Sequence, residues 1–130
     1  MKADHAQRPL VLLDLRKPRI RIHKNVLHAL GNPEYVLLLV NPVERLFAIT
    51  VGDRSDHRAH HISWSAAAHK KSFEIYSSSF MDALRLCSDW DENQAYRIYG
   101  KVIEERGVIQ FRVDDAFKYG NASESKEDIQ

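Results

Sequence analysis

The sequence predicts a mainly β domain of the α+β class, in which two β-α-β-β repeats form one pseudo-symmetric barrel. Three observations favour this fold. Apolar and polar residues alternate in several short segments, which is the period of half-buried strands. Two segments with helical spacing each follow such a strand. The order strand, helix, strand, strand occurs twice, and a unit this small cannot bury its apolar side chains without a second copy.

The length and composition fit one globular domain. At 130 residues, with 44% apolar and 28% charged residues, the chain can form a single core but not two ordinary ones. We expect one domain at 9–117 between flexible tails at 1–8 and 118–130. The domain divides into repeat 1 at about 9–51, a connecting loop at 52–71 and repeat 2 at about 72–117.

The hydropathy pattern predicts a cytoplasmic protein with no membrane partner. No apolar run approaches the roughly 20 residues that a membrane-spanning helix needs. The apolar stretch at 10–13 is interrupted by Asp14 before it could serve as the core of a signal peptide. Cys87 is the only cysteine, so no internal disulfide can form, and its place on an apolar helical stripe predicts a small buried side chain.

Repeat 1 begins with two strands joined by a tight turn. An apolar run at 9–15 predicts the first strand, and Pro18 sharpens the turn that follows it. Ile20 and Ile22 then alternate with basic residues, so one face of the second strand is predicted to be buried and the other to be cationic.

A short helix and a hairpin complete repeat 1. The apolar residues after Asn25 recur at helical spacing, Asn25 is the expected N-cap, and Gly31 ends the helix. Apolar strands at 35–40 and 45–51 follow, joined by a turn that contains Pro42.

The connecting loop at 52–71 is rich in histidine. Its four histidines and two aspartates are side chains of the kinds that hold transition metals. Their spacing matches no metal-binding motif, so we predict an ordinary polar loop with no metal and no cofactor. The histidines are His57, His60, His61 and His69.

Repeat 2 has the same order of elements with a longer helix. A strand at 72–76 alternates apolar and polar residues. The serine run 77–79 is expected to cap the helix after it, with Ser79 and Asp82 in the spacing of a capping box. Strands at 95–103 and 108–113 end the repeat.

The segment Asp14–Gly31 combines an acidic residue, a basic turn, two alternating isoleucines, a short helix and a closing Leu-Gly pair. This pattern resembles that of the AbrB/MraZ-type swapped-hairpin transcription factors, although Pro18 stands where the family prefers glycine. The resemblance implies a swapped-hairpin-like barrel built from two such units, here within one chain as an intramolecular pseudo-dimer. It also implies DNA binding through basic residues of the turn and the following strand.

The N-terminal part of the chain carries the positive charge. Residues 1–30 contain seven lysines and arginines and two aspartates, a net charge of +5, whereas 112–130 have a net charge of −2. Cations on one turn and one strand face are typical of surfaces that neutralise phosphates, the alternative being an ordinary solvated face. The candidate nucleic-acid-binding residues are Arg16, Lys17, Arg19, Arg21 and Lys24.

These features predict a protein without enzymatic activity. The chain contains neither a glycine-rich nucleotide-binding motif nor a Gly-x-Ser-x-Gly nucleophile motif, and we assign no catalytic residue. The leading hypothesis is a transcriptional regulator whose partner is double-stranded DNA. The alternative is a small protein-interaction or accessory domain on the same duplicated scaffold, because repeat 2 lacks a comparable basic strand. Exposed strand edges would also permit a homodimer.

Overall fold

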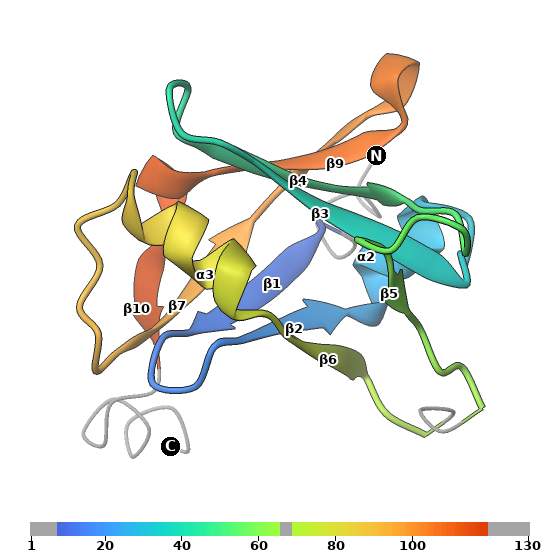
Figure 1. Ribbon diagram of the computed structural model, residues 1–130, viewed down its shortest axis with the longest axis horizontal. Helices are drawn as coiled ribbons and strands as arrows, with labels where there is room; N and C mark the ends of the chain where they lie inside the picture. The colour runs from blue at the N-terminus through green and yellow to red at the C-terminus, as the bar shows by residue number, and fades with distance from the viewer. Residues whose placement is uncertain (1–7, 66–68, 120–130) are drawn as a thin grey trace.

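Two antiparallel five-stranded sheets face one another across the core of the protein (Figure 1). The computed structural model describes residues 8–65 and 69–119. The strands of sheet A, in spatial order, are β10 (Phe117–Tyr119), β7 (Ala95–Tyr99), β1 (Leu10–Asp14), β2 (Arg19–His23) and β6 (Ser72–Tyr76). Those of sheet B are β5 (His60–His61), β3 (Tyr35–Asn41), β4 (Leu46–Val51), β9 (Val108–Arg112) and β8 (Lys101–Ile103).

Short helices connect these strands. α2 (Lys24–Ala29) continues directly from β2, and α3 (Ser78–Arg85) follows β6. Single turns of 3-10 helix at Glu104–Arg106 and Val113–Asp115 flank β9. Each α-helix therefore follows a strand that the alternation of residues predicts, β2 in repeat 1 and β6 in repeat 2.

One of the two predicted helix caps is confirmed. Ser77 Oγ accepts a hydrogen bond from the backbone N–H of Phe80 at 3.2 Å, so the serine run 77–79 provides the cap of α3 as predicted, although Ser79 itself lies inside the helix. The predicted cap Asn25 is wrong, since it lies inside α2, and His23 Nδ1 accepts the capping hydrogen bond from the N–H of Asn25 at 3.2 Å. Each strand leads straight into its helix, so the last extended residue supplies the non-helical backbone that an N-cap needs.

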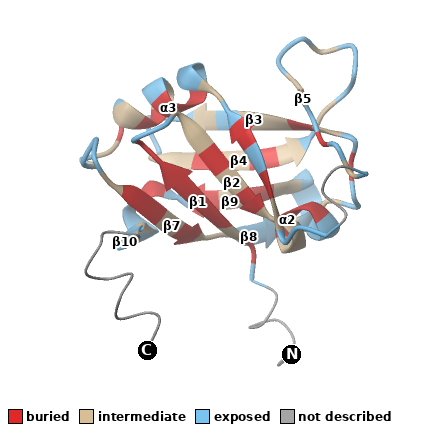
Figure 2. Ribbon diagram, turned by 90° about the horizontal axis from the view of Figure 1, so that it is seen from below, coloured by how far each residue is buried: buried red, intermediate tan, exposed pale blue. Residues whose placement is uncertain are grey.

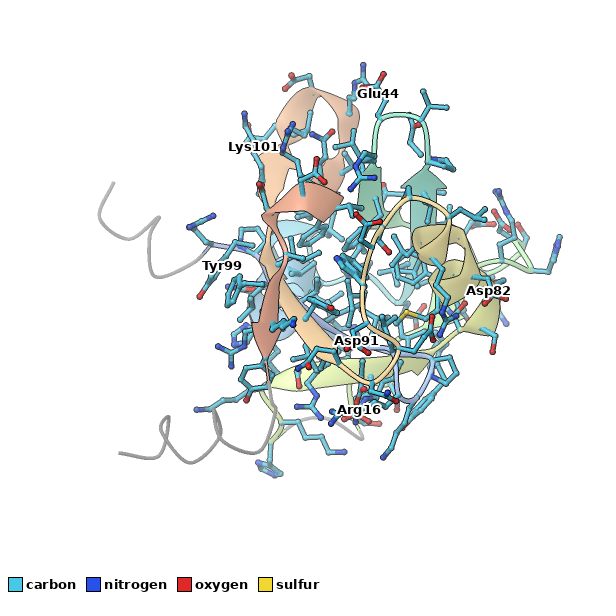
Figure 3. All side chains as sticks on the ribbon, turned by 90° about the vertical axis from the view of Figure 1, so that its left-hand side faces the viewer. Arg16, Glu44, Asp82, Asp91, Tyr99 and Lys101 are labelled. Atoms are coloured by element: carbon cyan, nitrogen blue, oxygen red, sulfur yellow. The ribbon has the colours of Figure 1, made fainter. Side chains whose placement is uncertain are left out.

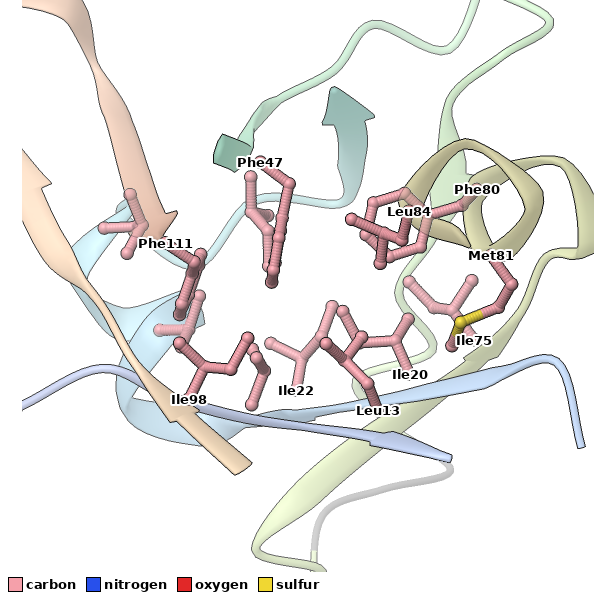
Figure 4. Packing of buried hydrophobic residues seen from close by; sticks show 14 of the residues in the cluster. Leu13, Ile20, Ile22, Phe47, Ile75, Phe80, Met81, Leu84, Ile98 and Phe111 are labelled. Atoms are coloured by element: carbon pink, nitrogen blue, oxygen red, sulfur yellow. The ribbon is translucent and has the colours of Figure 1, made fainter. Parts of the chain in front are cut away.

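The core lies between the two sheets and is covered on one side by α3 (Figure 4). Phe47 of β4 and Phe111 of β9 stack with ring centroids 4.8 Å apart, and Phe80 of α3 meets Phe47 edge-on at 5.4 Å. Stacked and edge-to-face pairs add to the free energy gained by burying the rings. From sheet A, the fully buried Ile20 and Ile22 point into the same space.

Corresponding strands of the two repeats pair with each other. β2 is antiparallel to β6, the strand that begins repeat 2. β4, which ends repeat 1, is antiparallel to β9, which ends repeat 2. One such pairing in each sheet means that the two repeats build a single core together.

The predicted barrel is wrong, because the two mainly β layers do not close on each other. In the described part of the chain, the edges are β10 and β6 in sheet A and β5 and β8 in sheet B, and no ladder joins the two sheets. The segment 95–103, predicted as one strand, changes partners at Gly100. β7 pairs with β1 in sheet A, and β8 pairs with β9 in sheet B. At this corner the chain passes directly from one sheet to the other without closing them, and the two sheets remain a sandwich.

Gly100 is the residue at which the chain passes from sheet A to sheet B. Tyr99 pairs with Leu10 in sheet A, whereas Lys101 pairs with Gln110 in sheet B (both are labelled in Figure 3). The N–H of Gly100 donates to the carbonyl oxygen of Pro9 at 2.8 Å, which ties the bend to the start of β1. A Cβ at this position would lie 2.5 Å from a ring carbon of Phe111, so the corner has no room for a side chain.

The connecting segment at 52–71 packs onto the core where the structure describes it. Trp64 donates from Nε1 to the carbonyl oxygen of Pro33 at 2.9 Å and meets Phe73 edge-on at 5.0 Å. This pair of contacts fixes the end of the segment against β6 and the start of β3.

Cys87 is a buried apolar side chain, as predicted. Only 5% of its surface is exposed, and burial raises the pKa of its thiol, which disfavours the thiolate. The sulfur atom accordingly serves packing beneath α3.

Most residues of the predicted flexible tails, 1–7 and 120–130, lie outside the described part of the chain. Arg8 and the last residues of β10 belong to the described fold. Within the described ranges, neither helix has the length and apolar character needed to cross a membrane.

Candidate nucleic-acid interface

The outer face of sheet A carries two of the five predicted basic residues, Arg19 and Arg21. The isoleucines of β2 are buried in the core, so Arg19 and Arg21 point to the opposite side. Across the sheet, Arg21 lies opposite Leu12 and Glu74, and Leu12 lies opposite Arg97 of β7. In Figure 2, α2 and α3 lie at the margins of the molecule and neither crosses β1 or β7. Among the described residues, no helix covers this face of sheet A.

Two carboxylates neutralise much of the predicted basic cluster. Asp14 accepts hydrogen bonds from Arg16 Nε and from Arg19 Nη2, each at 2.8 Å. Glu74 accepts hydrogen bonds from Arg19 Nη1 at 3.2 Å and from Arg21 Nη2 at 3.1 Å. The structure thus brings Arg16, Arg19 and Arg21 together, but as an ion-pair network in which three guanidinium groups share two carboxylates.

Asp14 is the one buried charged side chain among the described residues, with 2% of its surface exposed. Burial by itself would raise the pKa of its carboxyl group, but hydrogen bonds from the side chain and backbone of Arg16, and from Arg19, bring this pKa below its ordinary value. Asp14 is consequently ionised at neutral pH and fixes the β1–β2 turn to β2.

The other two predicted residues lie at either end of β2. Lys17 is exposed in the β1–β2 turn, where its backbone N–H donates to the carbonyl oxygen of Asp14 at 3.3 Å. Lys24 begins α2, and its backbone N–H donates to the carbonyl oxygen of Lys71 at 2.9 Å. The second bond places Lys24 beside Lys71, a lysine outside the predicted set.

A shallow groove crosses the outer face of sheet A next to Arg21. Its volume is about 270 Å³, and Leu10 and Leu12 of β1 give it an apolar part. None of its lining residues is acidic. The polar residues that line it are Arg21, His23, Lys71, Ser72, Arg97 and Tyr119.

A second depression of about 470 Å³ continues this groove. It shares His23 and Lys71 with the first and is otherwise lined by Lys24, His69 and Lys70, again without an acidic residue. We call the two depressions together the cationic groove. Its lysines and arginines are Arg21, Lys24, Lys70, Lys71 and Arg97.

Two cations of the groove, Lys71 and Arg97, differ from the cations of the turn in their surroundings. Among the described residues, no carboxylate lies within 4.0 Å of the charged groups of Lys71 and Arg97, whereas Arg19 contacts two and Arg21 contacts one. An anion that reaches Lys71 or Arg97 therefore does not have to displace a carboxylate.

Aromatic rings border the groove at the edge formed by β7 and β10. The guanidinium carbon of Arg97 lies 4.0 Å from the ring centroid of Tyr119, and that of Arg8 lies 4.5 Å from the ring centroid of Tyr99. Tyr99 stacks on Phe117 with centroids 6.3 Å apart and planes inclined by 25°. We call Tyr99, Phe117 and Tyr119 the aromatic edge.

Sequence reasoning selected Arg21 and Lys24 but missed the other cations of the groove. Arg97 is a single arginine within a strand, and only the pairing of β7 with β1 brings it near Arg21. Lys70 and Lys71 did carry a signal, because two adjacent lysines directly precede the first strand of repeat 2.

The histidine-rich loop is divided between different surroundings. His61 tilts against Tyr35 with ring centroids 5.1 Å apart, and burial lowers the pKa of His60, while His69 lines the cationic groove. Among the residues that the structure describes, no three His, Cys, Asp or Glu side chains are grouped so as to hold a metal ion.

Comparison of this chain with models of protein families, with curated proteins and with solved structures finds no match.

Proposed function

We propose that this chain is a non-catalytic nucleic-acid-binding protein, of the kind a transcriptional regulator requires, which holds the phosphates of its ligand in the cationic groove. The observation that carries the proposal is the gathering of lysines and arginines in the two depressions of the groove, neither of which has an acidic lining residue. The nearest described acidic residue is Glu74, which lines an adjoining depression together with Arg21, Lys70 and Lys71. Such cations displace counterions from phosphates and give an affinity that depends strongly on salt. The AbrB/MraZ-like pattern at Asp14–Gly31 adds support for DNA, and a cytoplasmic location suits such a partner.

The ion pairs around the β1–β2 turn favour the groove over the turn as the principal contact surface. Drawing Arg16 or Arg19 toward a phosphate would weaken their hydrogen bonds to Asp14, whose charge is buried. Lys71 and Arg97 carry no such cost.

Replacing Lys71 and Arg97 should weaken binding. For Lys71→Gln/Arg97→Gln we expect the Kd for mixed-sequence DNA to rise about tenfold at about 0.1 M salt, because each side chain loses a charge-assisted contact with a phosphate. The slope of log K against log salt should fall in magnitude by about 2. Fluorescence anisotropy with labelled duplex and single-stranded DNA over a salt series measures both quantities.

The matched control is Lys101→Gln/Arg106→Gln, which makes the same change of charge at exposed residues of β8 and the turn after it. This variant should keep Kd within about twofold of the wild type, since only long-range charge is lost. An equal loss of affinity in the two double variants would contradict the groove as the binding surface.

Glu74→Gln should strengthen binding. The change removes the carboxylate that Arg19 and Arg21 share, so the guanidinium group of Arg21 becomes available to phosphates, while Arg19 keeps its ion pair with Asp14. We expect Kd to fall about threefold to tenfold at low salt, with a salt slope steeper by about 1. Glu44→Gln, an equal change at the tip of the β3–β4 hairpin, should leave Kd nearly unaltered. Unchanged or weaker binding by Glu74→Gln would show that Arg21 does not contact the ligand.

A protein-interaction domain is the second candidate function, favoured by the outer face of sheet B. Strand alternation turns a set of apolar side chains away from the core there, and Leu39 among them is 39% exposed. The set comprises Leu37, Leu39, Leu46, Ala48, Ile103 and Val108. Failure to bind any nucleic acid at low salt would select this second function.

A further inference from the structure

Aromatic side chains lie within one strand spacing of the cations of the groove. Tyr119 lines the groove itself, and Arg97 lies both in the groove and over the Tyr119 ring. Phe117 of β10 pairs directly with Arg97 of β7, which sets the two on the same outer face about 5 Å apart along the sheet. Charge and flat apolar surface therefore alternate across one continuous part of the molecule.

Phe117 adds an apolar surface that the fold does not use. It is 45% exposed on an edge strand, and its ring stacks on Tyr99 but takes no part in the buried core. A phenylalanine cannot contact a phosphate through a hydrogen bond. What it offers a ligand in this charged setting is a face on which another flat ring can stack.

The elements that commonly read duplex DNA offer little basic surface in this protein. α2 has only six residues, with Lys24 at its start, and on α3 the guanidinium group of Arg85 is paired with Asp82 and Glu92 at 2.8 Å each. In the β3–β4 turn, Glu44 is acidic and the guanidinium group of Arg45 is paired with Asp114 at 2.6 Å. The cations instead line a recess in a sheet face, which does not enter a major groove as a helix or a protruding ribbon does.

We infer that the ligand of the cationic groove is a single-stranded nucleic acid, with its phosphates along the lysines and arginines and its bases stacked on the aromatic edge. This inference rests on the proposed function and specifies its ligand. A single strand exposes phosphates and base faces together, whereas a duplex hides its base faces within the stack. Arg97 joins the two parts of the site, because it lines the groove and covers the Tyr119 ring.

The test compares ligands and ring variants by fluorescence anisotropy at one salt concentration. The probes are labelled oligothymidylate and oligouridylate of about 15 nucleotides and a mixed-sequence DNA duplex of the same length. We expect the wild type to bind the single strands at least tenfold more tightly than the duplex. Phe117→Leu/Tyr119→Leu, which removes both rings but keeps apolar bulk, should weaken single-strand binding about tenfold to a hundredfold and alter duplex binding less than twofold. The thymidylate and uridylate arms tell DNA from RNA.

Two further variants control for folding and for loss of an aromatic ring as such. Tyr35→Leu removes a ring next to His61 on sheet B and should leave all three affinities unchanged. Phe117→Trp keeps a stacking surface, so its affinity should stay within about twofold of the wild type. A bound single strand should quench the tryptophan emission of Phe117→Trp more than that of the wild type. This readout does not depend on whether the leucine double variant folds.

The outcomes separate the inference from the proposed function. Binding of the duplex as tightly as the single strands overturns the inference and leaves the proposed function standing. Single-strand binding that is indifferent to loss of both rings, with no extra quenching in Phe117→Trp, overturns the stacking role. Absence of binding to all three probes overturns both proposals.

Discussion

Gly100→Ala is expected to lower the free energy of unfolding by about 3 kcal/mol, because the added methyl group overfills the corner between the sheets. It would lie 2.5 and 2.7 Å from two ring carbons of Phe111 and 2.9 Å from the carbonyl oxygen of Gln110. Phe111 is fully buried and stacked on Phe47, and Gln110 belongs to the β9 ladder, so neither neighbour can yield cheaply. Urea denaturation should show the loss, with a midpoint of thermal unfolding lower by about 10 °C.

Gly107→Ala is the control for this substitution. A Cβ there would meet no heavy atom within 4 Å, but the backbone has a φ of +65°. The expected cost is only the about 1–2 kcal/mol of left-handed backbone strain. Adding Phe111→Leu to each variant separates the clash with the ring from backbone strain. The double variant Gly100→Ala/Phe111→Leu should be more stable, by more than about 0.5 kcal/mol, than the sum of the two single changes predicts. Simple additivity would rule out the clash with the ring.

Asp14→Asn is expected to lower the free energy of unfolding at pH 7 by about 2–3 kcal/mol. The carboxylate accepts hydrogen bonds from Arg16 and Arg19, and the Arg19 side chain is only 13% exposed. An uncharged amide in the same place leaves that guanidinium group half-buried with weaker partners. Glu74→Gln, which also breaks contacts of Arg19 but at an exposed carboxylate, should cost no more than about 1 kcal/mol.

The effect of Asp14→Asn should depend on pH in one direction. The folded protein holds the pKa of Asp14 below its unfolded value. As the solution is acidified, the unfolded chain therefore binds more protons than the folded chain does. The stabilisation by Asp14 is therefore complete above the unfolded pKa of about 4 and is lost as pH falls through the folded pKa. Urea titrations at pH 7 and pH 3 should show the wild type and Asp14→Asn converging at the lower pH. A constant difference would mean that the ion pairs do not cause it.

Local alternation in the sequence was sufficient to locate several elements. The predicted strands at 19–23 and 72–76 coincide with β2 and β6, and the apolar segments at 35–40 and 45–51 form the β3–β4 hairpin. These elements satisfy their hydrogen bonds with near neighbours or bury one clear face, so the residue pattern determines them. The barrel failed for a different reason. The alternation through 95–103 continues across Gly100, and the approach of Phe111 that bends the chain there is a tertiary contact.

The candidate site was predictable in part. The basic side of β2 followed from alternation, but the carboxylates that oppose it come from the end of β1 and from β6, so the extent of its neutralisation depends on strand register. The same register adds Arg97 to the groove from a strand far along the chain. Tyr119 reaches the groove only because β10 pairs with β7. The polar sequence around Tyr119 had instead predicted a flexible tail at 118–130.

The position of β1 between β2 and β7 has a consequence for biosynthesis. β1 precedes the other described strands in the sequence, yet Leu10 pairs with Tyr99. As the chain emerges from the ribosome, the apolar β1 can find β2 at once, but its other edge stays open until β7 has been made. Sheet A must therefore be completed late, and during translation the nascent chain displays a hydrophobic strand edge of the type that chaperones recognise.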